Sequence, residues 1–430
     1  MKMAVMSNER IERSAAEAAV AAHYGLLLGI RSPWQVQQAD LDLAARRVEI
    51  VVEHDPESAV SCPQCGASCP RHDHAPERTW RHLDVMQFTT LIRAKVPRAN
   101  CPEHGVGTVR TAWAEPNSRF TLLFEAFAVQ VIAACRSLTQ AADLLRLDWD
   151  GVQRVLDRAV ARGLARRSTE GLRYVGLDEK SFGRGQDYVS LMTDLPGHRV
   201  LEVVAGRDGE QAVALWESLP EPQRQQVEAA TMDMGADFAA ATRKAAPQVQ
   251  IVHDKFHVSK LLNEAVDKVR KEEHRRLLAA GDESLKDTKF LWLQGAAVTG
   301  DRALRFEELC ERDLKTARAW EYKETFVEFW AQPDVATALD FFTHWFRTVR
   351  RSKLEPLKKT ALTFKDHLLG LLNYFVHPIT NALTEGFNSR IQAIKADARG
   401  FRRFANYRAR ILFFCGKLDL APHIPSALTH

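Results

Sequence analysis

The sequence predicts an α/β protein in which a mixed five-stranded sheet with helices is interrupted by an all-helical insertion and preceded by two smaller domains. Three strand-like runs between residues 174 and 205 are followed by alternating helical and strand-like runs up to residue 252. Residues 256–375 are almost entirely helical in pattern and include four tryptophans. Ahead of the sheet, a segment rich in Cys, His and Pro precedes helical periodicity over residues 122–164.

The chain begins with an N-terminal segment, residues 1–60, that carries no chemical motif. It opens with an Ala-rich stretch of helical character and then alternates like a strand over residues 47–52. In the next segment, residues 61–112, an alternating run over residues 88–96 is typical of one arm of a hairpin.

Two pairs of potential metal ligands lie in residues 61–112. Cys62 and Cys65 are separated by two residues, as are Cys101 and His104, and 35 residues lie between the pairs. Thiolate and imidazole ligands in fours suit tetrahedral zinc, and a site made only of protein ligands is structural. Seven cysteines in a chain without an export signal argue against a disulfide framework. The alternative ligands, whose spacing gives no second pair, are Cys69, His72 and His74.

Residues 120–168 are predicted to form a helix-turn-helix DNA-binding domain. A helix over residues 137–145 contains two adjacent alanines that permit close helix contact, and Asp148 or Asp150 can cap the helix that follows. Base-reading side chains belong on the outer face of that second helix. We expect Gln153, Arg154, Asp157 and Arg158 to project there, with Gln153, Arg154 and Arg158 as the candidate DNA contacts. An ordinary helical hairpin is the alternative.

The sheet follows a linker over residues 163–171, and its strands can be placed individually because turn signals separate them. The expected strands are Tyr174–Asp178, Tyr188–Thr193, Val200–Ala205, a fourth that ends at Asp233, and Val249–Val252, with helices Gly209–Leu219 and Ala236–Ala245 in the last two connections. A final helix is expected over residues 380–395, after Pro378.

Three carboxylates stand at informative positions in this pattern. Asp178 and Asp233 end the first and the fourth strand, which are neighbours if the sheet is ribonuclease-H-like. Glu385 starts the last helix and can supply a third carboxylate. Together they would hold two hard cations, which take oxygen ligands and leave positions open for phosphate and water. Taken alone, an acid at a helix start is more often a residue that favours the helix dipole.

Composition and charge exclude several classes of protein. With 46% hydrophobic and 27% charged residues, 22 Gly and 17 Pro, the chain is neither collagen-like nor disordered. Its most apolar stretches are shorter than the roughly 20 residues of a membrane helix. Glutamates precede the first apolar run, so we expect no secretory signal and a cytoplasmic, nucleoid-associated protein.

One basic cluster is a candidate contact for DNA phosphates. The net charge of +4 is too small to establish an anionic partner, but residues 386–417 hold eight Lys/Arg against the single acid Asp397. Arg399, Arg402 and Arg403 in this cluster are the candidate phosphate contacts; a solvated helix face is the alternative.

Taken together, these motifs resemble the transposases of the ISL-three insertion-sequence family, over nearly the whole chain from about residue 61 to residue 417. The motifs that carry the resemblance are Cys62-x-x-Cys65, Arg81-His-Leu-Asp84, the helix-turn-helix, Gly176-Leu-Asp-Glu-Lys180, Met232-Asp-Met234, Asp254-Lys-Phe-His257 followed by Lys268-Val-Arg270, Thr384-Glu-Gly-Phe-Asn388 and Gly400-Phe401. Many relatives have Cys where this chain has His104.

The resemblance implies a ribonuclease-H-like Asp-Asp-Glu catalytic domain over residues 172–417, with an all-α insertion at about residues 265–375. It implies that Asp178, Asp233 and Glu385 are catalytic and hold two Mg²⁺ (or Mn²⁺) ions. It also implies that Asp254 and His257 support the active site, with bracing of the fifth strand as the alternative role of His257. The implied activity is strand cleavage at terminal inverted repeats and strand transfer into target DNA by a homo-oligomer, with one structural zinc ion per chain.

Two other functions are compatible with parts of the sequence. A zinc and helix-turn-helix regulator with an inactive catalytic domain would explain the N-terminal half, but the complete carboxylate trio argues against it. A ribonuclease-H-like nuclease acting on branched DNA would explain the carboxylates but would not need an N-terminal module that recognises DNA ends.

Overall fold

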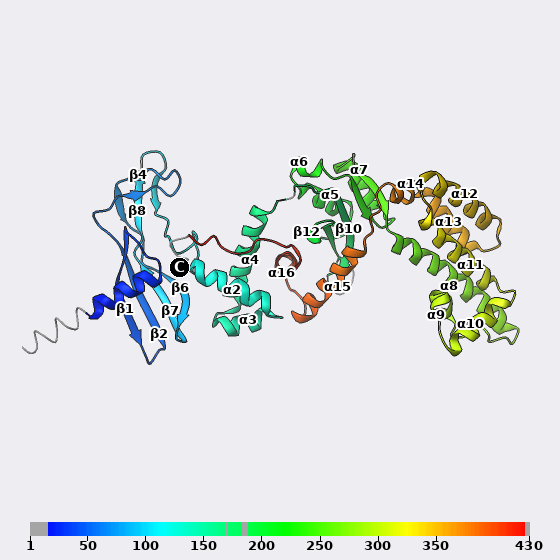
Figure 1. Ribbon diagram of the computed structural model, residues 1–430, viewed down its shortest axis with the longest axis horizontal. Helices are drawn as coiled ribbons and strands as arrows, with labels where there is room; N and C mark the ends of the chain where they lie inside the picture. The colour runs from blue at the N-terminus through cyan, green and yellow to red at the C-terminus, as the bar shows by residue number, and fades with distance from the viewer. Residues whose placement is uncertain (1–15, 169, 183–187, 426–430) are drawn as a thin grey trace, which may run out of the picture. The chain divides into compact units, whose positions relative to one another are not determined.

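The computed structural model describes residues 16–168, 170–182 and 188–425. The chain divides into two compact units, residues 1–167 with 418–430 and residues 168–417 (Figure 1). Among the described residues, no helix combines the length and the hydropathy that spanning a lipid bilayer requires.

The first unit opens with a helix over residues 16–27 and a four-stranded sheet. The strands of this sheet, in the order β1-β2-β7-β6, are β1 (Trp34–Asp42), β2 (Arg47–His54), β6 (Arg78–Val85) and β7 (Phe88–Ala94). The hairpin expected around residues 88–96 is present as the antiparallel pair β6–β7, and β2 runs parallel to β7. Because β1 and β2 belong to the same sheet as β6 and β7, residue 60 does not separate two folded parts.

The Cys- and His-rich segment adds two small sheets. They are β3 (Val60–Ser61) with β4 (Ser68–Cys69), and β5 (Arg71–His74), β8 (Pro97–Cys101) and β9 (Gly105–Thr108) in the order β5-β8-β9. The core beneath them is small, with Val60, Ala99 and three cysteines buried. So few apolar side chains give little stability on their own, which favours a metal as the main stabilising element.

Three helices follow, α2 (Leu122–Ala134), α3 (Leu138–Leu145) and α4 (Trp149–Arg166). Ser137 caps α3 and Asp148, not Asp150, caps α4 by accepting the Gly151 N–H. Arg146 adopts the left-handed conformation that ends α3 and turns the chain into α4. The helix-turn-helix expectation is therefore confirmed, although α4 continues to Arg166, into the stretch from residue 163 that the sequence pattern assigns to a linker.

A buried ion cluster joins α2 to α4. The Glu125 carboxylate is fully buried, accepts a hydrogen bond from the Ser118 hydroxyl at 2.7 Å and forms ion pairs with Arg158 at 2.6 Å and Arg162 at 3.1 Å. Arg162 also lies 3.4 Å from Glu115. These ion pairs fix how α4 lies on α2.

The second unit contains the five-stranded mixed sheet that the sequence predicts. Its strands, in the order β12-β11-β10-β13-β14, are β10 (Tyr174–Ser181), β11 (Tyr188–Asp194), β12 (Arg199–Ala205), β13 (Ala229–Met232) and β14 (Gln250–His253). The first three strands are antiparallel, and β13 and β14 run parallel to β10. The expectation that the first and fourth strands are neighbours is confirmed.

Helices cover this sheet. The helices that follow β12 are α5 (Gly209–Glu217), a short α6 (Glu221–Arg224) and α7 (Ala236–Ala245). The two longer ones pack on each other, and Trp216 of α5 lies in the core that they share with the sheet. Near the C-terminal end of the unit, α15 (Ala382–Asp397) packs on β10 and α16 (Phe404–Cys415) packs on β12. The sequence did not predict α6 or α16.

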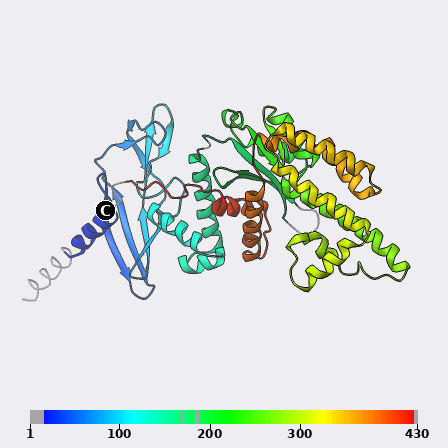
Figure 2. The same cartoon turned by 45° about the vertical axis from the view of Figure 1, so that its right-hand side comes forward.

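The all-helical insertion lies between β14 and α15. Its elements are α8 (Lys255–Ala279), α9 (Lys289–Gln294), η1 (Gly295–Ala297), α10 (Asp301–Glu311), α11 (Lys315–Val327), η2 (Glu328–Ala331), α12 (Val335–Arg351), α13 (Glu355–Asp366), α14 (Leu368–Leu372) and η3 (Asn373–Phe375). The long helix α8 packs against α11 and α13 (Figures 1 and 2). The first helix after β14 begins at Lys255, and the sequence places the start of the insertion at about residue 265.

The insertion has its own aromatic core. The Trp345 ring is stacked with the Phe364 ring and makes an edge-to-face contact with Phe326, with 4.6 Å between the ring centroids of the latter pair. The buried Glu273 carboxylate on α8 accepts the Lys315 N–H at 3.0 Å and the Thr316 N–H at 2.7 Å. It thereby satisfies the N-terminal amides of α11, as a capping residue would. The tryptophans serve this core.

The Glu125 cluster yields a stability prediction. Changing Glu125 to Ala leaves two largely buried guanidinium groups without their counter-charge, which should destabilise the α2–α4 region by about 3 to 5 kcal/mol. Amide hydrogen exchange of α2 and α4 in the full chain measures this loss. Asp143→Ala, an exposed change on α3, is the control and should alter protection by no more than about 0.5 kcal/mol. Equal protection in the two variants would contradict the prediction.

Candidate active site and metal centres

The pairing of β10 with β13 brings two aspartates to one place on the sheet. Tyr174 pairs with Ala229, and Gly176 pairs with Thr231, so the register between these strands is a constant offset of 55 residues. The same offset separates Asp178 from Asp233, which follows the last residue of β13. Parallel strands in constant register keep such residues adjacent. Sequence and register therefore agree on the neighbourhood of these two carboxylates.

Each aspartate is oriented by nearby donors. Asp178 Oδ1 accepts the Glu179 N–H at 2.8 Å, and Asp178 Oδ2 accepts a hydrogen bond from Asn388 Nδ2 at 2.6 Å. Asp233 Oδ1 accepts the Gly235 N–H at 2.8 Å. Asn388 lies on α15 one turn after Glu385. Sequence reasoning missed its role, although it stands in the same motif as Glu385.

Glu385 reaches this region because α15 begins directly on β10. A Cβ on Gly176 would come within 2.5 Å of Thr384 Oγ1 and 2.6 Å of Asn381 Oδ1, so only glycine permits this approach. Asn381 Nδ2 donates to the Leu177 carbonyl at 3.2 Å, and the Thr384 and Thr193 hydroxyls lie 2.8 Å apart. The first turn of α15, which carries Glu385, is thereby fixed next to Asp178.

Burial and like charge raise the pKa values of these acids. Burial raises the pKa of Asp178, with a further contribution from Asp233. Burial also raises the pKa of Glu385, to which Asp254 and then Asp178 add. The His257 charge opposes both shifts. Clustered carboxylates of this kind occur at functional sites, and a bound cation relieves their mutual repulsion.

Asp178, Asp233 and Glu385 offer only oxygen donors. Among the described residues, the group whose ligand atoms already lie close enough together to hold a metal ion is the Cys/His cluster, whose atoms lie within 4.8 Å of one another. Oxygen donors suit Mg²⁺ or Mn²⁺, which retain positions for water and phosphate.

Asp254 and His257 occupy different positions near the trio. Asp254 is buried between β14 and α8, and its Oδ1 accepts the Asn381 N–H at 3.0 Å. It therefore joins the start of the insertion to the start of α15. His257 lies in the first turn of α8 and is close enough to influence both Asp178 and Glu385.

A pair of histidines, His253 and His367, also lies next to Asp233, and sequence reasoning did not identify it. His253 Nδ1 is 3.1 Å from the Asp233 carbonyl oxygen, and His253 Nε2 is 3.2 Å from His367 Nδ1. Burial, followed by the nearby His367, lowers the pKa of His253 to about 4. No spacing in the sequence links residue 253 to residue 367, so only the fold reveals this pair.

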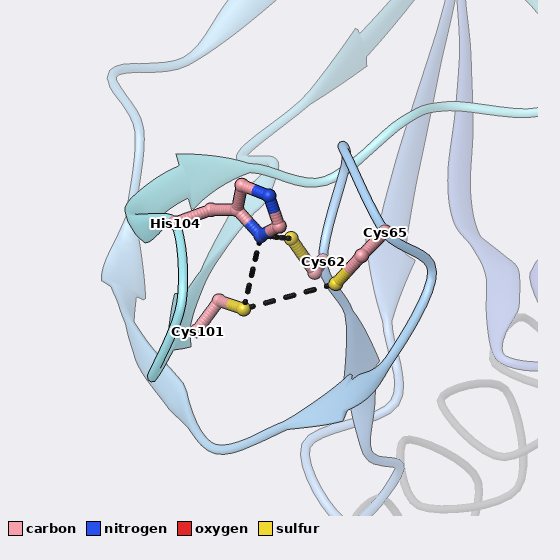
Figure 3. Close-up of side chains that lie close together, drawn as sticks. All are labelled: Cys62, Cys65, Cys101 and His104. Carbon is pink, nitrogen blue, oxygen red and sulfur yellow. Dashed lines mark hydrogen bonds between the residues drawn. The ribbon is translucent and has the colours of Figure 1, made fainter.

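The structure brings together the four predicted zinc ligands. Figure 3 shows Cys62, Cys65, Cys101 and His104 facing one another from two loops. Cys65 and Cys101 sulfurs are 3.8 Å apart, and His104 Nδ1 lies 3.6 Å from the sulfur of Cys101 and 3.9 Å from that of Cys62. A tetrahedral zinc site has ligand-to-ligand distances of about 3.5 to 3.8 Å. The four residues therefore fit one zinc ion.

The local chemistry also favours zinc. The His104 ring, followed by the backbone N–H groups of Glu103 and His104, lowers the pKa of Cys101 to about 6, so this thiol is ionised at neutral pH as a metal ligand must be. Gly66, at a φ of 74°, provides the tight turn after Cys65. The alternative ligand Cys69 lies outside the cluster and donates to the Ala67 carbonyl.

The candidate DNA contacts on α4 need correction. The expectation that Gln153 and Arg158 project is wrong: Gln153 is buried and bonded to Asp157, and Arg158 is paired with Glu125. The cause is that α4 packs on both α2 and α3, so its buried face is wider than an apolar stripe suggests. Arg154 is exposed, with 53% of its side chain accessible.

The basic cluster near the C-terminus is accessible. Arg399, Arg402 and Arg403 are all exposed in the turn between α15 and α16. Arg399 and Gly400 both have positive φ, 53° and 95°, which gives the turn its sharp bend. The structure thus permits the phosphate contacts expected of these three side chains.

Three family models match consecutive parts of the chain. The model described as a transposase matches residues 175–411, which is more than half of the chain. The model for the zinc-finger of transposase IS204/IS1001/IS1096/IS1165 matches residues 58–104, and that for the helix-turn-helix domain of transposase family ISL3 matches residues 109–160.

Full-length relatives agree with these matches. The transposase for insertion sequence element IS1001 of Bordetella parapertussis is 27% identical over 353 residues, covering 79% of this chain and 85% of the relative. The transposase for insertion sequence element IS1557 of Mycobacterium tuberculosis is 24% identical over 432 residues, covering 93% of this chain and 95% of the relative.

The zinc cluster predicts about one zinc ion per chain. Cys101→Ser should lose the zinc and unfold the strands around β8, because the local core is too small to hold them, while the second unit stays folded. Cys69→Ser is the matched control and should retain the metal. Elemental analysis and hydrogen exchange give both readouts. A chelator-free preparation without zinc, or equal zinc in the two variants, would refute this assignment.

Proposed function

Because the chain belongs to the ISL3 family of transposases, we propose that it binds the terminal inverted repeats of an insertion sequence and catalyses metal-dependent strand cleavage and strand transfer. One observation carries the catalytic part: paired residues of β10 and β13 are 55 positions apart, and so are Asp178 and Asp233. Glu385 joins them because its helix, α15, packs directly against Gly176 of β10.

In this proposal Asp178, Asp233 and Glu385 hold two Mg²⁺ or Mn²⁺ ions. Divalent cations, when bound, activate the attacking oxygen and stabilise the leaving oxygen in phosphoryl transfer. The chain's own groups keep the ligands in place: Asn388 holds one oxygen of Asp178, and the Gly235 N–H holds one oxygen of Asp233. His257 supplies a positive charge beside Asp178 and Glu385 when it is protonated.

The first unit recognises the DNA ends in this proposal, through its zinc-binding part and the exposed face of α4. Arg154 is the candidate base contact on that face, and Arg399, Arg402 and Arg403 on the second unit are candidate phosphate contacts. Transposition requires two element ends to be handled together, so we expect a homo-oligomer on DNA. Target DNA binds at the catalytic unit.

The catalytic assignment predicts separate losses of cleavage and binding. Asp178→Asn, Asp233→Asn and Glu385→Gln should each reduce Mg²⁺-dependent cleavage of a DNA duplex that contains an element end to background. Each change replaces a charged carboxylate ligand with a neutral amide, which binds the cation more weakly. Binding to the same duplex should be nearly unchanged. Asp237→Asn, an exposed acid in the first turn of α7, is the control. A Glu385→Gln protein that cleaves near the parental rate would remove Glu385 from the site.

The DNA-binding assignment predicts two different kinds of loss. Arg154→Ala should weaken binding to the element ends by about 1 to 3 kcal/mol more than binding to random DNA, because base contacts discriminate. Neutralising Arg399, Arg402 and Arg403 should weaken binding to all sequences alike and reduce the salt slope by about 0.9 per lost contact. Arg243→Gln, an exposed change on α7, is the control.

Competition binding at several salt concentrations measures both effects. If Arg154→Ala lowers specific and random binding equally, α4 contacts phosphates and the zinc-binding part must read the ends. If the triple variant keeps the parental salt slope, its three arginines do not contact DNA.

A further inference from the structure

We propose that the helical insertion positions Asp233 through the hydrogen-bonded pair His253 and His367, which makes both histidines positioning residues for the metal site. This inference rests on the proposed function, because it assumes that Asp233 is a metal ligand. It gives the insertion a defined role in catalysis that does not depend on contact with DNA.

The direction of the hydrogen bonds follows from the chemistry of the groups. A carbonyl oxygen can only accept, so His253 Nδ1 must carry the proton that it shares with the Asp233 carbonyl. In the neutral ring, Nε2 is then an acceptor, and His367 Nδ1 must donate to it. The two bonds form one chain from the α13–α14 junction to the Asp233 backbone. Consecutive bonds of this kind strengthen one another in a buried setting.

The pair holds a part of Asp233 that the sheet leaves unsupported. The last paired residues of β13 and β14 are Met232 and His253, so the Asp233 carbonyl lies beyond the ladder. Among the described residues, it is the His253 ring that donates a hydrogen bond to the backbone oxygen of Asp233. The orientation of the Asp233 peptide, and with it that of its carboxylate, therefore depends on where the His253 ring lies.

The insertion fixes that ring from the other side. A Cβ on Gly370 of α14 would lie 2.3 Å from Cδ2 and 2.7 Å from Nε2 of His253, so the α14 backbone packs directly on the imidazole. Asn373 Nδ2 also donates to the Ile251 carbonyl at 2.8 Å. Since β14 is the edge strand, these contacts from the insertion replace a neighbouring strand there. His367, Gly370 and Asn373 thus all contact β14.

The expected effect is on metal affinity. Removing a residue that orients a metal ligand typically lowers metal affinity by about 10- to 100-fold. His367→Ala removes the donor to His253, and Gly370→Ala displaces the His253 ring without touching either histidine. Both changes should allow the Asp233 peptide to rotate. His367→Gln keeps an N–H donor and should recover most of the effect. His344→Ala, an exposed histidine on α12, is the matched control.

The test is Mn²⁺ binding to the full-length protein without DNA, measured by titration with detection of free Mn²⁺. His367→Ala and Gly370→Ala should raise the Mn²⁺ dissociation constant by about 10-fold. The Mg²⁺ concentration for half-maximal cleavage should rise by the same factor, with binding to element ends unchanged. His367→Gln should lie close to the parental protein, and His344→Ala should equal it. Thermal unfolding of each variant shows that the comparison is made on folded protein.

Parental Mn²⁺ affinity in both folded His367→Ala and folded Gly370→Ala would overturn the positioning role. So would a His367→Gln protein as weak as His367→Ala, since the loss would then reflect packing and not the hydrogen bond. Failure of the proposed function gives a different result: the parental protein would bind Mn²⁺ no more tightly than Asp233→Asn does.

Discussion

The second unit depends on holding two carboxylates beside each other, Asp178 on β10 and Asp233 directly after the neighbouring strand β13. Unscreened, Asp178 and Asp233 repel, and burial makes the charged form of Asp178 less favourable still. The fold offsets this by donating an N–H or amide group to each carboxylate and by placing His257 nearby. A sheet can impose such proximity because its register is fixed along its whole length. A single-residue slip of β13 against β10 would separate the pair.

The long insertion leaves this geometry intact because its two ends are joined. The chain leaves the sheet at Asp254 and returns at Asn381, and the carboxylate of the first accepts the backbone N–H of the second at 3.0 Å. A segment whose ends meet can be long without displacing what flanks it. Asn381 then passes the constraint to β10 through the Leu177 carbonyl. The insertion is thus attached to the site at two places: the Asp254–Asn381 hydrogen bond that joins its ends, and the His253–His367 contact.

Much of the fold and of the carboxylate site follows from local sequence patterns. The alternation in the strands of the second unit, with glycine and proline between them, predicts their order, and from that order follows the neighbourhood of Asp178 and Asp233. The zinc ligands follow from spacing alone, because two residues between donors form a turn that presents both to one ion. The structure agrees with both patterns.

Other features could not be predicted because they depend on packing between distant segments. Gln153 is buried and Arg158 is paired with Glu125 because helices pack on two sides of α4. The pairing of β2 with β7 joins the N-terminal segment to the Cys- and His-rich segment, whose different compositions suggest two separate parts. The His253–His367 contact spans 114 residues of sequence. Each of these features is a contact between segments that are distant in sequence. The periodic patterns of a single sequence predict local helices and strands but not such contacts.

We infer that Asp178, Asp233 and Glu385 surround one site for divalent cations. It is tested most directly by replacing Mg²⁺ with Fe²⁺ and generating hydroxyl radicals at the bound ion, which cleave the polypeptide near where the ion sits. If the three carboxylates bind the cation, cuts fall close to residues 178, 233 and 385 and disappear when excess Mg²⁺ is added. Cuts confined to other parts of the chain, or cuts near these residues that Mg²⁺ does not suppress, would contradict it.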